Sequence, residues 1–176
     1  KITSGADLKG MKIRLPGGIA ARGGEAFGAG AVTVPAPKVY ETLSSKVAEA
    51  VFMPPETHKS FRLSEVTKFI LRVPGNLYDG SFAFILNPKK FEAMSKEDQA
   101  AVKAVTGEKL SAYAGSRWVA ADKSGYDAAK AAGNEVTDAT PAMIEELKKI
   151  GATLEADWVK RAAGKGYDPA TALKEL

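Results

Sequence analysis

The sequence has no cysteine, which excludes disulfide bonds, thiolate metal sites and a cysteine nucleophile. It has one histidine, so a Ser-His-Asp triad would have to use His58, and no Gly-x-Ser-x-Gly elbow is present to supply the serine. Long apolar runs are also missing, since the longest ones, such as residues 48–55 and 82–86, have only the length of a strand. We therefore expect no catalytic residue, no metal and no cofactor.

Charge of one sign is not concentrated in any segment. The chain has 25 basic and 21 acidic residues, and its lysines alternate with acids, as in residues 145–149. We interpret these stretches as solvated helix faces, which argues against a nucleic-acid partner. The chain begins without a methionine or an apolar signal segment, a start that is compatible with a mature or truncated protein.

The first third of the chain predicts the fold class. With 176 residues, of which 45% are hydrophobic, the chain is long enough for one domain with a real core. Strand patterns at residues 11–16, 31–34 and 47–53 alternate with helical patterns at residues 20–27 and 37–43. This β-α-β-α-β order predicts an α/β fold with a mainly parallel sheet flanked by helices.

The remaining elements are expected as a mixture of strands and longer helices. A capping box at Ser95 begins a long helix, and Thr140-Pro141 begins a long C-terminal helix with a break expected at Gly151. The expected ranges are a helix at 56–68, strands at 68–73 and 81–86, a short helix at 88–94, helices at 95–132 and 140–163, and a short strand around Val136.

Arg14 is the most informative residue for function. It lies near the carboxyl end of the first strand, where open α/β sheets bind their ligands. Its planar guanidinium can make two hydrogen bonds to a carboxylate, and Gly17 in the next loop lets a backbone approach closely. The alternative is an edge-strand arginine that pairs with a surface acid.

Three more candidates follow the third strand. Phe52 and Met53 would form an apolar pocket wall at the same rim, and Glu56 would add a polar contact. Core packing is the favoured interpretation for at least one of the first two, because neighbouring strand residues face opposite sides. Phe84, in the strand expected at 81–86, is a further candidate for the pocket lining.

The order of these segments resembles the solute-binding proteins of tripartite ATP-independent periplasmic (TRAP) transporters. Residues 7–16 resemble the segment that opens the second lobe in that family. Residues 38–43, Lys-Val-Tyr-Glu-Thr-Leu, resemble its P-x-x-E-V-Y-x-A-L helix, and residues 84–99 resemble its strand, short helix and long-helix start. The resemblance covers essentially the whole chain.

This resemblance implies a periplasmic binding protein that captures a small organic-acid anion by hinge closure and delivers it to the TRAP membrane subunits. In the family, the arginine that matches Arg14 binds the ligand carboxylate. Gly17, Ala36 and Met53 stand where the member best known for sialic acid has polar or bulky residues. We therefore expect a ligand with an aromatic or branched body.

The resemblance also implies a domain division. Residues 1–79 and 120–176 resemble the second lobe, and residues 80–119 resemble the stretch that crosses back into the first lobe. Because this stretch would lack its partners here, we expect the chain either to self-associate or to be found with the first lobe as a separate chain. Two alternatives remain open: an effector-sensing α/β domain of a regulator, and a small α/β enzyme that acts on a carboxylic acid through Glu56 or His58.

Overall fold

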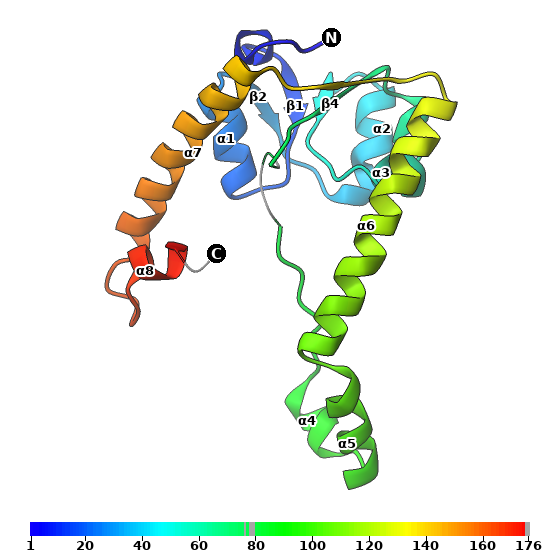
Figure 1. Ribbon diagram of the computed structural model, residues 1–176, viewed down its shortest axis with the longest axis vertical. Coiled ribbons are helices and arrows are strands. Elements are labelled where there is room, and N and C mark those ends of the chain that lie inside the picture. The colour runs from blue at the N-terminus through cyan, green and yellow to red at the C-terminus, as the bar shows by residue number, and fades with distance from the viewer. Residues whose placement is uncertain (76, 78–79, 175–176) are drawn as a thin grey trace.

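The computed structural model describes residues 1–75, 77 and 80–174, and Figure 1 shows two long helices that extend away from a region with short strands. We call residues 80–119 the arm and the rest of the described chain the sheet region. No helix in the described ranges is both long enough and apolar enough to cross a membrane.

The first sheet has three parallel strands in the order β2-β1-β3, as the sequence predicts. The strands are β1 (Lys12–Arg14), β2 (Gly30–Val32) and β3 (Ala50–Val51). In the central strand, Ile13 is fully buried and lies opposite Ala31 on one side and Ala50 on the other. The crossovers are α1 (Ile19–Ala26) and, after the 3-10 helix η2 (Ala36–Lys38), α2 (Val39–Ser44).

The strand expected at residues 47–53 is shorter than predicted. The backbone N–H groups of Val47 and Ala48 both donate to the carbonyl of Thr42, at 3.0 and 3.2 Å. These two residues therefore complete the end of α2, and β3 itself consists of residues 50 and 51 only.

A separate pair of parallel strands forms the second sheet. The strands β4 (Phe69–Arg72) and β5 (Glu135–Asp138) confirm the strands expected near these positions, but they do not join the first sheet. Arg72 and Asp138 lie opposite each other and form a two-point ion pair, with hydrogen bonds of 2.5 and 2.8 Å. The hydrogen bonds from Arg72 hold the pKa of Asp138 below its usual range.

The single helix expected at residues 56–68 is wrong. The structure has instead α3 (Thr57–Ser60) and the 3-10 helix η3 (Leu63–Glu65). Arg62 lies between them with φ of 57°, a left-handed conformation that cannot continue a right-handed helix. Its guanidinium pairs with Glu65 and lies over the ring of Tyr40, 5.7 Å from the centroid.

The core of the sheet region consists of two clusters. One joins β1 to the 3-10 helix η1 (Gly5–Leu8) and to the start of α7 (Pro141–Ala162), and the other lies beneath α2 and η3. The buried members of the first are Leu8, Ile13, Leu15, Ala29, Ala139 and Met143, and those of the second are Val39, Leu43, Ala48 and Leu63.

The arm begins with an extended segment and continues through α4 (Pro88–Glu92), α5 (Lys96–Val105) and the first half of α6 (Glu108–Ala131). The strand expected at residues 81–86 is wrong: these residues form no strand. A strand needs a neighbour for its backbone hydrogen bonds, and no other described segment pairs with this one. Phe82 instead packs against Trp118, with ring centroids 4.7 Å apart.

The long helices also differ from the prediction. The helix expected at 95–132 divides at Thr106 and Gly107, because Gly107 has φ of 68°. The predicted cap is confirmed, since Ser95 Oγ accepts from the Asp98 N–H at 3.0 Å. The C-terminal helix α7 runs through Gly151 without the expected break, and a short helix that the sequence analysis missed, α8 (Pro169–Lys174), follows it.

Candidate functional site

Arg14 lies at the carboxyl end of the central strand and is almost completely buried, with 4% of its surface exposed. Its Nε and Nη2 donate to the carbonyl of Val34 at 3.1 and 2.8 Å. Its Nη1 donates to the sulfur of Met53 at 2.9 Å. Since Val34 follows β2 and Met53 follows β3, this guanidinium connects the ends of both neighbouring strands.

Backbone hydrogen bonds extend the pairing past the strand ends. Leu15 N–H donates to Val32 at 3.2 Å, and Phe52 N–H donates to the carbonyl of Arg14 at 3.0 Å. The three segments that carry Arg14, Val34 and Met53 are therefore fixed relative to one another by the sheet itself.

Gly17 lies in the loop between β1 and α1. No atom lies within 4 Å of the position that a Cβ would occupy at Gly17, so this side of the loop is open. The next residue, Gly18, has φ of 75° and precedes the first turn of α1. The N-terminus of a helix favours an anion, and α1 begins five residues after the buried Arg14.

Phe52 and Glu56 have contacts that differ from their predicted roles. Phe52 is half-buried and packs against the first core cluster, which agrees with the core-packing alternative. The carboxylate of Glu56 accepts a hydrogen bond from Ser60 Oγ and so turns back onto α3. Its backbone N–H donates to Asp122 Oδ1 of α6 at 3.2 Å.

Phe84 lies away from this rim. It belongs to the extended segment that Figure 1 shows running down from the sheet region towards α4, and its side chain is 79% exposed. The structure thus brings Met53 to Arg14, which the Gly17 loop follows in the chain, and it does not bring Phe84 to them.

His58 has the character of a packing residue. It is 9% exposed, it lies on α3 where this helix packs against α6, and burial lowers its pKa. A buried neutral imidazole is a weak candidate for acid-base chemistry unless a partner orients it. Among the described residues, its Nδ1 atom has no hydrogen-bond partner.

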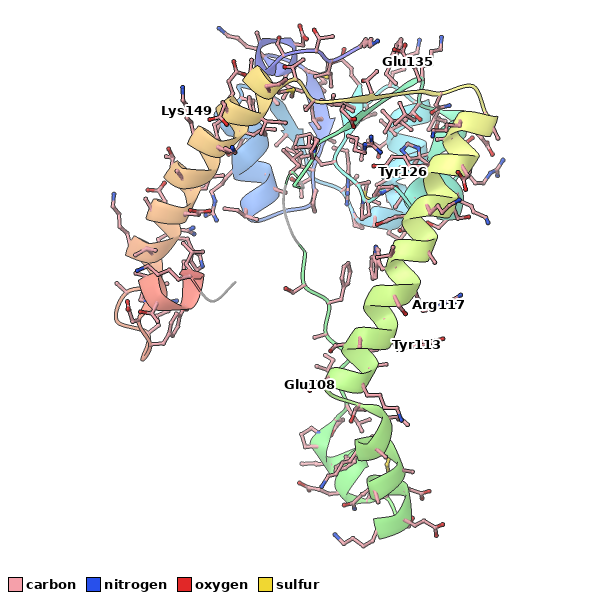
Figure 2. The ribbon with its side chains drawn as sticks, viewed as in Figure 1. Glu108, Tyr113, Arg117, Tyr126, Glu135 and Lys149 are labelled. Carbon is pink, nitrogen blue, oxygen red and sulfur yellow. The ribbon has the colours of Figure 1, made fainter. Side chains whose placement is uncertain are left out.

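The sequence analysis missed the contribution of α6. Figure 2 shows Tyr126 on the part of α6 beside the sheet region, whereas Glu108, Tyr113 and Arg117 lie on the part that extends beyond it. Tyr126 faces Arg72, whose guanidinium carbon is 6.0 Å from the ring centroid. The buried Gly125, next to Tyr126, was a visible signal, because glycine inside a helix often marks a close approach.

Solved TRAP periplasmic solute-binding proteins are similar to this chain. One from Bordetella bronchiseptica, with bound (R)- and (S)-mandelate, is 34% identical with a TM-score of 0.91 over 98% of this chain and 55% of that chain. A marine metagenome protein described as specific for aromatic acid ligands, in complex with metahydroxyphenylacetate, is 33% identical with a TM-score of 0.88 and the same coverage. A third, from Rhodoferax ferrireducens with copurified benzoate, is 25% identical with a TM-score of 0.86 and covers 99% of this chain and 55% of that chain.

A curated relative extends the comparison. The "Outer membrane transporter protein TsaT" of Comamonas testosteroni is 26% identical over 167 residues, which cover 94% of this chain and 49% of that protein. The chain thus spans about half the length of the relatives it matches.

A family model for bacterial extracellular solute-binding proteins, family 7, matches residues 1–161. This match confirms the TRAP resemblance and the α/β fold class, and it decides against the enzyme alternative, because the family and its relatives here are transport proteins. The chain belongs to the DctP family of bacterial extracellular solute-binding proteins.

Proposed function

We propose that this chain carries half of the ligand site of a periplasmic TRAP solute-binding protein. The protein captures a small organic-acid anion through a carboxylate contact to Arg14 and delivers it to the membrane subunits of the transporter. The observation that carries this proposal is the buried guanidinium at the carboxyl end of the central strand, held by Val34 and Met53.

The way in which Arg14 is held favours anion binding. An arginine side chain normally loses considerable rotamer freedom when it binds a ligand. Here Nε and both terminal nitrogens already have fixed partners, so this loss occurs on folding. The guanidinium is therefore preorganised near the open Gly17 loop, and it can bind an anion in a fixed orientation at low entropic cost.

The surroundings of Arg14 support a ligand with an aromatic or branched body. Gly17 leaves room, Ala36 has a small side chain, and Met53 provides a thioether, which makes favourable contacts with aromatic rings. The relatives from Bordetella and the marine metagenome bind aromatic acids, and this supports the same class of ligand for this chain.

The arm belongs, in this proposal, with a first lobe that closes over the ligand. None of the described residues between 80 and 119 is buried, and the apolar side chains there include Ile85, which is 93% exposed. Such a surface is typical of a protein interface. If the 176-residue chain is produced alone, we expect it to self-associate through the arm, and light scattering checks this.

Calorimetric titration of the complete protein with (R)-mandelate and benzoate tests the role of Arg14. Losing a two-point contact to a charged partner should weaken binding about a hundredfold with Arg14→Ala. Arg14→Lys, which keeps the charge but loses the planar fork, should weaken it about tenfold. The control Arg161→Ala removes an exposed arginine of α7 and should bind as the wild type does.

Equal affinities for the wild type and Arg14→Ala would refute the carboxylate contact. The same titration with sialic acid and a uronic acid tests the class of ligand. A clear preference for either of these sugar acids over mandelate and benzoate would refute the aromatic or branched body.

A further inference from the structure

We infer that α6 positions the ligand site, and that Gly125 and Asp122 are the residues through which it does so. They hold the loop of residues 53–56, whose first residue, Met53, contacts the guanidinium of Arg14. Neither residue would touch the ligand. The inference rests on the proposed function only where ligand affinity is measured.

Gly125 allows α6 to touch the backbone of this loop. A Cβ at position 125 would lie 2.0 Å from the carbonyl oxygen of Pro55, 2.6 Å from its carbonyl carbon and 2.7 Å from the Cα of Glu56. These are main-chain atoms, which cannot rotate out of the way as a side chain could. Even a methyl group at this position would therefore push the helix and the loop apart.

Polar contacts on the same face of α6 fix the loop further. Asp122, almost one turn before Gly125, accepts the Glu56 N–H at 3.2 Å. Ser124 Oγ accepts from Lys59 Nζ of α3 at 3.0 Å. The side chain of Asp122 thus satisfies a backbone donor that α3 leaves unpaired at its start.

The loop is stiff enough to transmit a displacement to Met53. Two consecutive prolines, Pro54 and Pro55, restrict its backbone. Thr57 donates to the carbonyl of Pro54 from its N–H at 3.1 Å and from its hydroxyl at 2.6 Å, and His58 N–H donates to Pro55 at 3.1 Å. Movement at Pro55 therefore passes along the chain to the sulfur beside Arg14.

The cost of glycine in a helix supports this inference. Glycine is disfavoured relative to alanine inside a helix, so a buried glycine there calls for a structural reason. The contact with Pro55 supplies that reason, because alanine would strengthen α6 and break its fit to the loop.

Methyl NMR of the complete protein, with carbon-13 in the methionine ε-methyl groups, tests the positioning without any ligand. This chain contributes four methionines, and Met53→Leu identifies the Met53 signal. Gly125→Ala should shift that signal. The control Gly151→Ala, at a helical position of α7 with no atom within 4 Å of the added Cβ, should leave it in place.

Asp122 provides a milder pair of variants. Asp122→Ala removes the acceptor for the Glu56 N–H and should shift the Met53 signal, whereas Asp122→Asn keeps an oxygen acceptor and should restore it. This pair decides the inference if Gly125→Ala fails to fold. An unchanged Met53 signal in folded Gly125→Ala, or in Asp122→Ala where Gly125→Ala does not fold, would overturn it.

Titration with (R)-mandelate and benzoate measures the consequence for binding. We expect affinity to fall about tenfold with Gly125→Ala and about threefold with Asp122→Ala, and to be unchanged with Gly151→Ala. Undiminished affinity in Gly125→Ala would contradict the inference. A wild type that binds neither acid would instead count against the proposed ligand class, and the NMR comparison would still decide the positioning role.

Discussion

The sheet region and the arm are stabilised in different ways. Every hydrophobic side chain that the structure describes as buried belongs to the sheet region, including Ile13, Val39 and Leu63. The arm has helices of ordinary geometry but no buried residue among those described. The difference shows that this sequence can form helices in the arm without forming a hydrophobic core there.

Local capping explains how the arm keeps its helices. Asn87 Oδ1 accepts from the Lys89 N–H at the start of α4, and Ser95 Oγ accepts from the Asp98 N–H at the start of α5. Each cap stabilises a helix by about 1 kcal/mol, which is enough to select where a helix begins but not to bury a face. In the sheet region, long-range packing of side chains stabilises the helices in addition to such caps.

Valine-to-alanine substitutions should give the largest difference in the free energy of unfolding between the two regions. Val39→Ala removes methyl groups from a fully buried side chain of α2 and should lower the free energy of unfolding by about 2–3 kcal/mol. Val119→Ala acts on a side chain of the arm that is 73% exposed and should change it by less than about 0.5 kcal/mol. Urea denaturation of the 176-residue chain, at a concentration where light scattering shows a monomer, measures both.

The same pair in the complete protein would sharpen the comparison. If the arm packs against a first lobe, Val119→Ala should become clearly destabilising there, while Val39→Ala keeps its cost. A destabilisation by Val119→Ala that matches Val39→Ala in the 176-residue chain would contradict the difference between the regions.

Glycine-to-alanine substitutions should lower the stability of the sheet region and raise that of the arm. A Cβ at Gly24 of α1 would lie 2.5 Å from Cδ1 of the fully buried Leu15, so Gly24→Ala should destabilise the fold by about 1–2 kcal/mol. A Cβ at Gly115 of α6 would meet no atom within 4 Å, so Gly115→Ala should stabilise the helix by about 0.5–1 kcal/mol. Thermal unfolding followed by circular dichroism compares them, and equal signs would be the contrary result.

The contact between the rings of Phe82 and Trp118 should stabilise only the arm. Phe82→Ala removes the ring that packs on Trp118 and should cost the arm about 0.5–1 kcal/mol, without changing the unfolding midpoint of the sheet region. Trp118 fluorescence, recorded with Trp158 replaced by phenylalanine, should shift to longer wavelength as the indole becomes more exposed. An unchanged spectrum would show that this contact does not persist in solution.

The smallest effect concerns pH and is confined to the sheet region, since its His58 is the one histidine of the chain. Burial lowers the folded-state pKa of His58 from 6.5, so the unfolded chain takes up the proton more readily. Its contribution to stability is therefore complete above pH 6.5 and is lost as the pH falls from 6.5 through the lowered pKa. Unfolding midpoints between pH 5 and 7 should show this slope, and His58→Gln should remove it.

The sequence predicted the position of Arg14 better than its partners. A strand that ends in a glycine loop is visible in local pattern, and this placed Arg14 at the carboxyl rim. The carbonyl of Val34 and the sulfur of Met53 depend on how β2 and β3 register against β1, which is a long-range property. The pattern at each strand could not supply that information alone.

The wrong prediction of a strand at residues 81–86 has the same long-range origin. The continuous apolar run at residues 82–86 shows that this segment could be a buried strand, but not whether a neighbouring strand exists to pair with it. The break of the long helix at Gly107 was, by contrast, signalled locally by the pair Thr106-Gly107 and was overlooked. Local chemistry fixes caps and breaks, whereas strand formation depends on the rest of the fold.

The close contact between Gly125 and Pro55 gives α6 the geometry of a lever. This contact lies near the carboxyl end of a helix of 24 residues, and the 17 residues before it extend about 26 Å to Glu108. A rotation of about 5° at the contact would carry the far end of such a helix about 2 Å, with only a fraction of an ångström of movement at the loop. A small movement of the loop that carries Met53 would thus become a larger displacement at Glu108, where α6 follows α5.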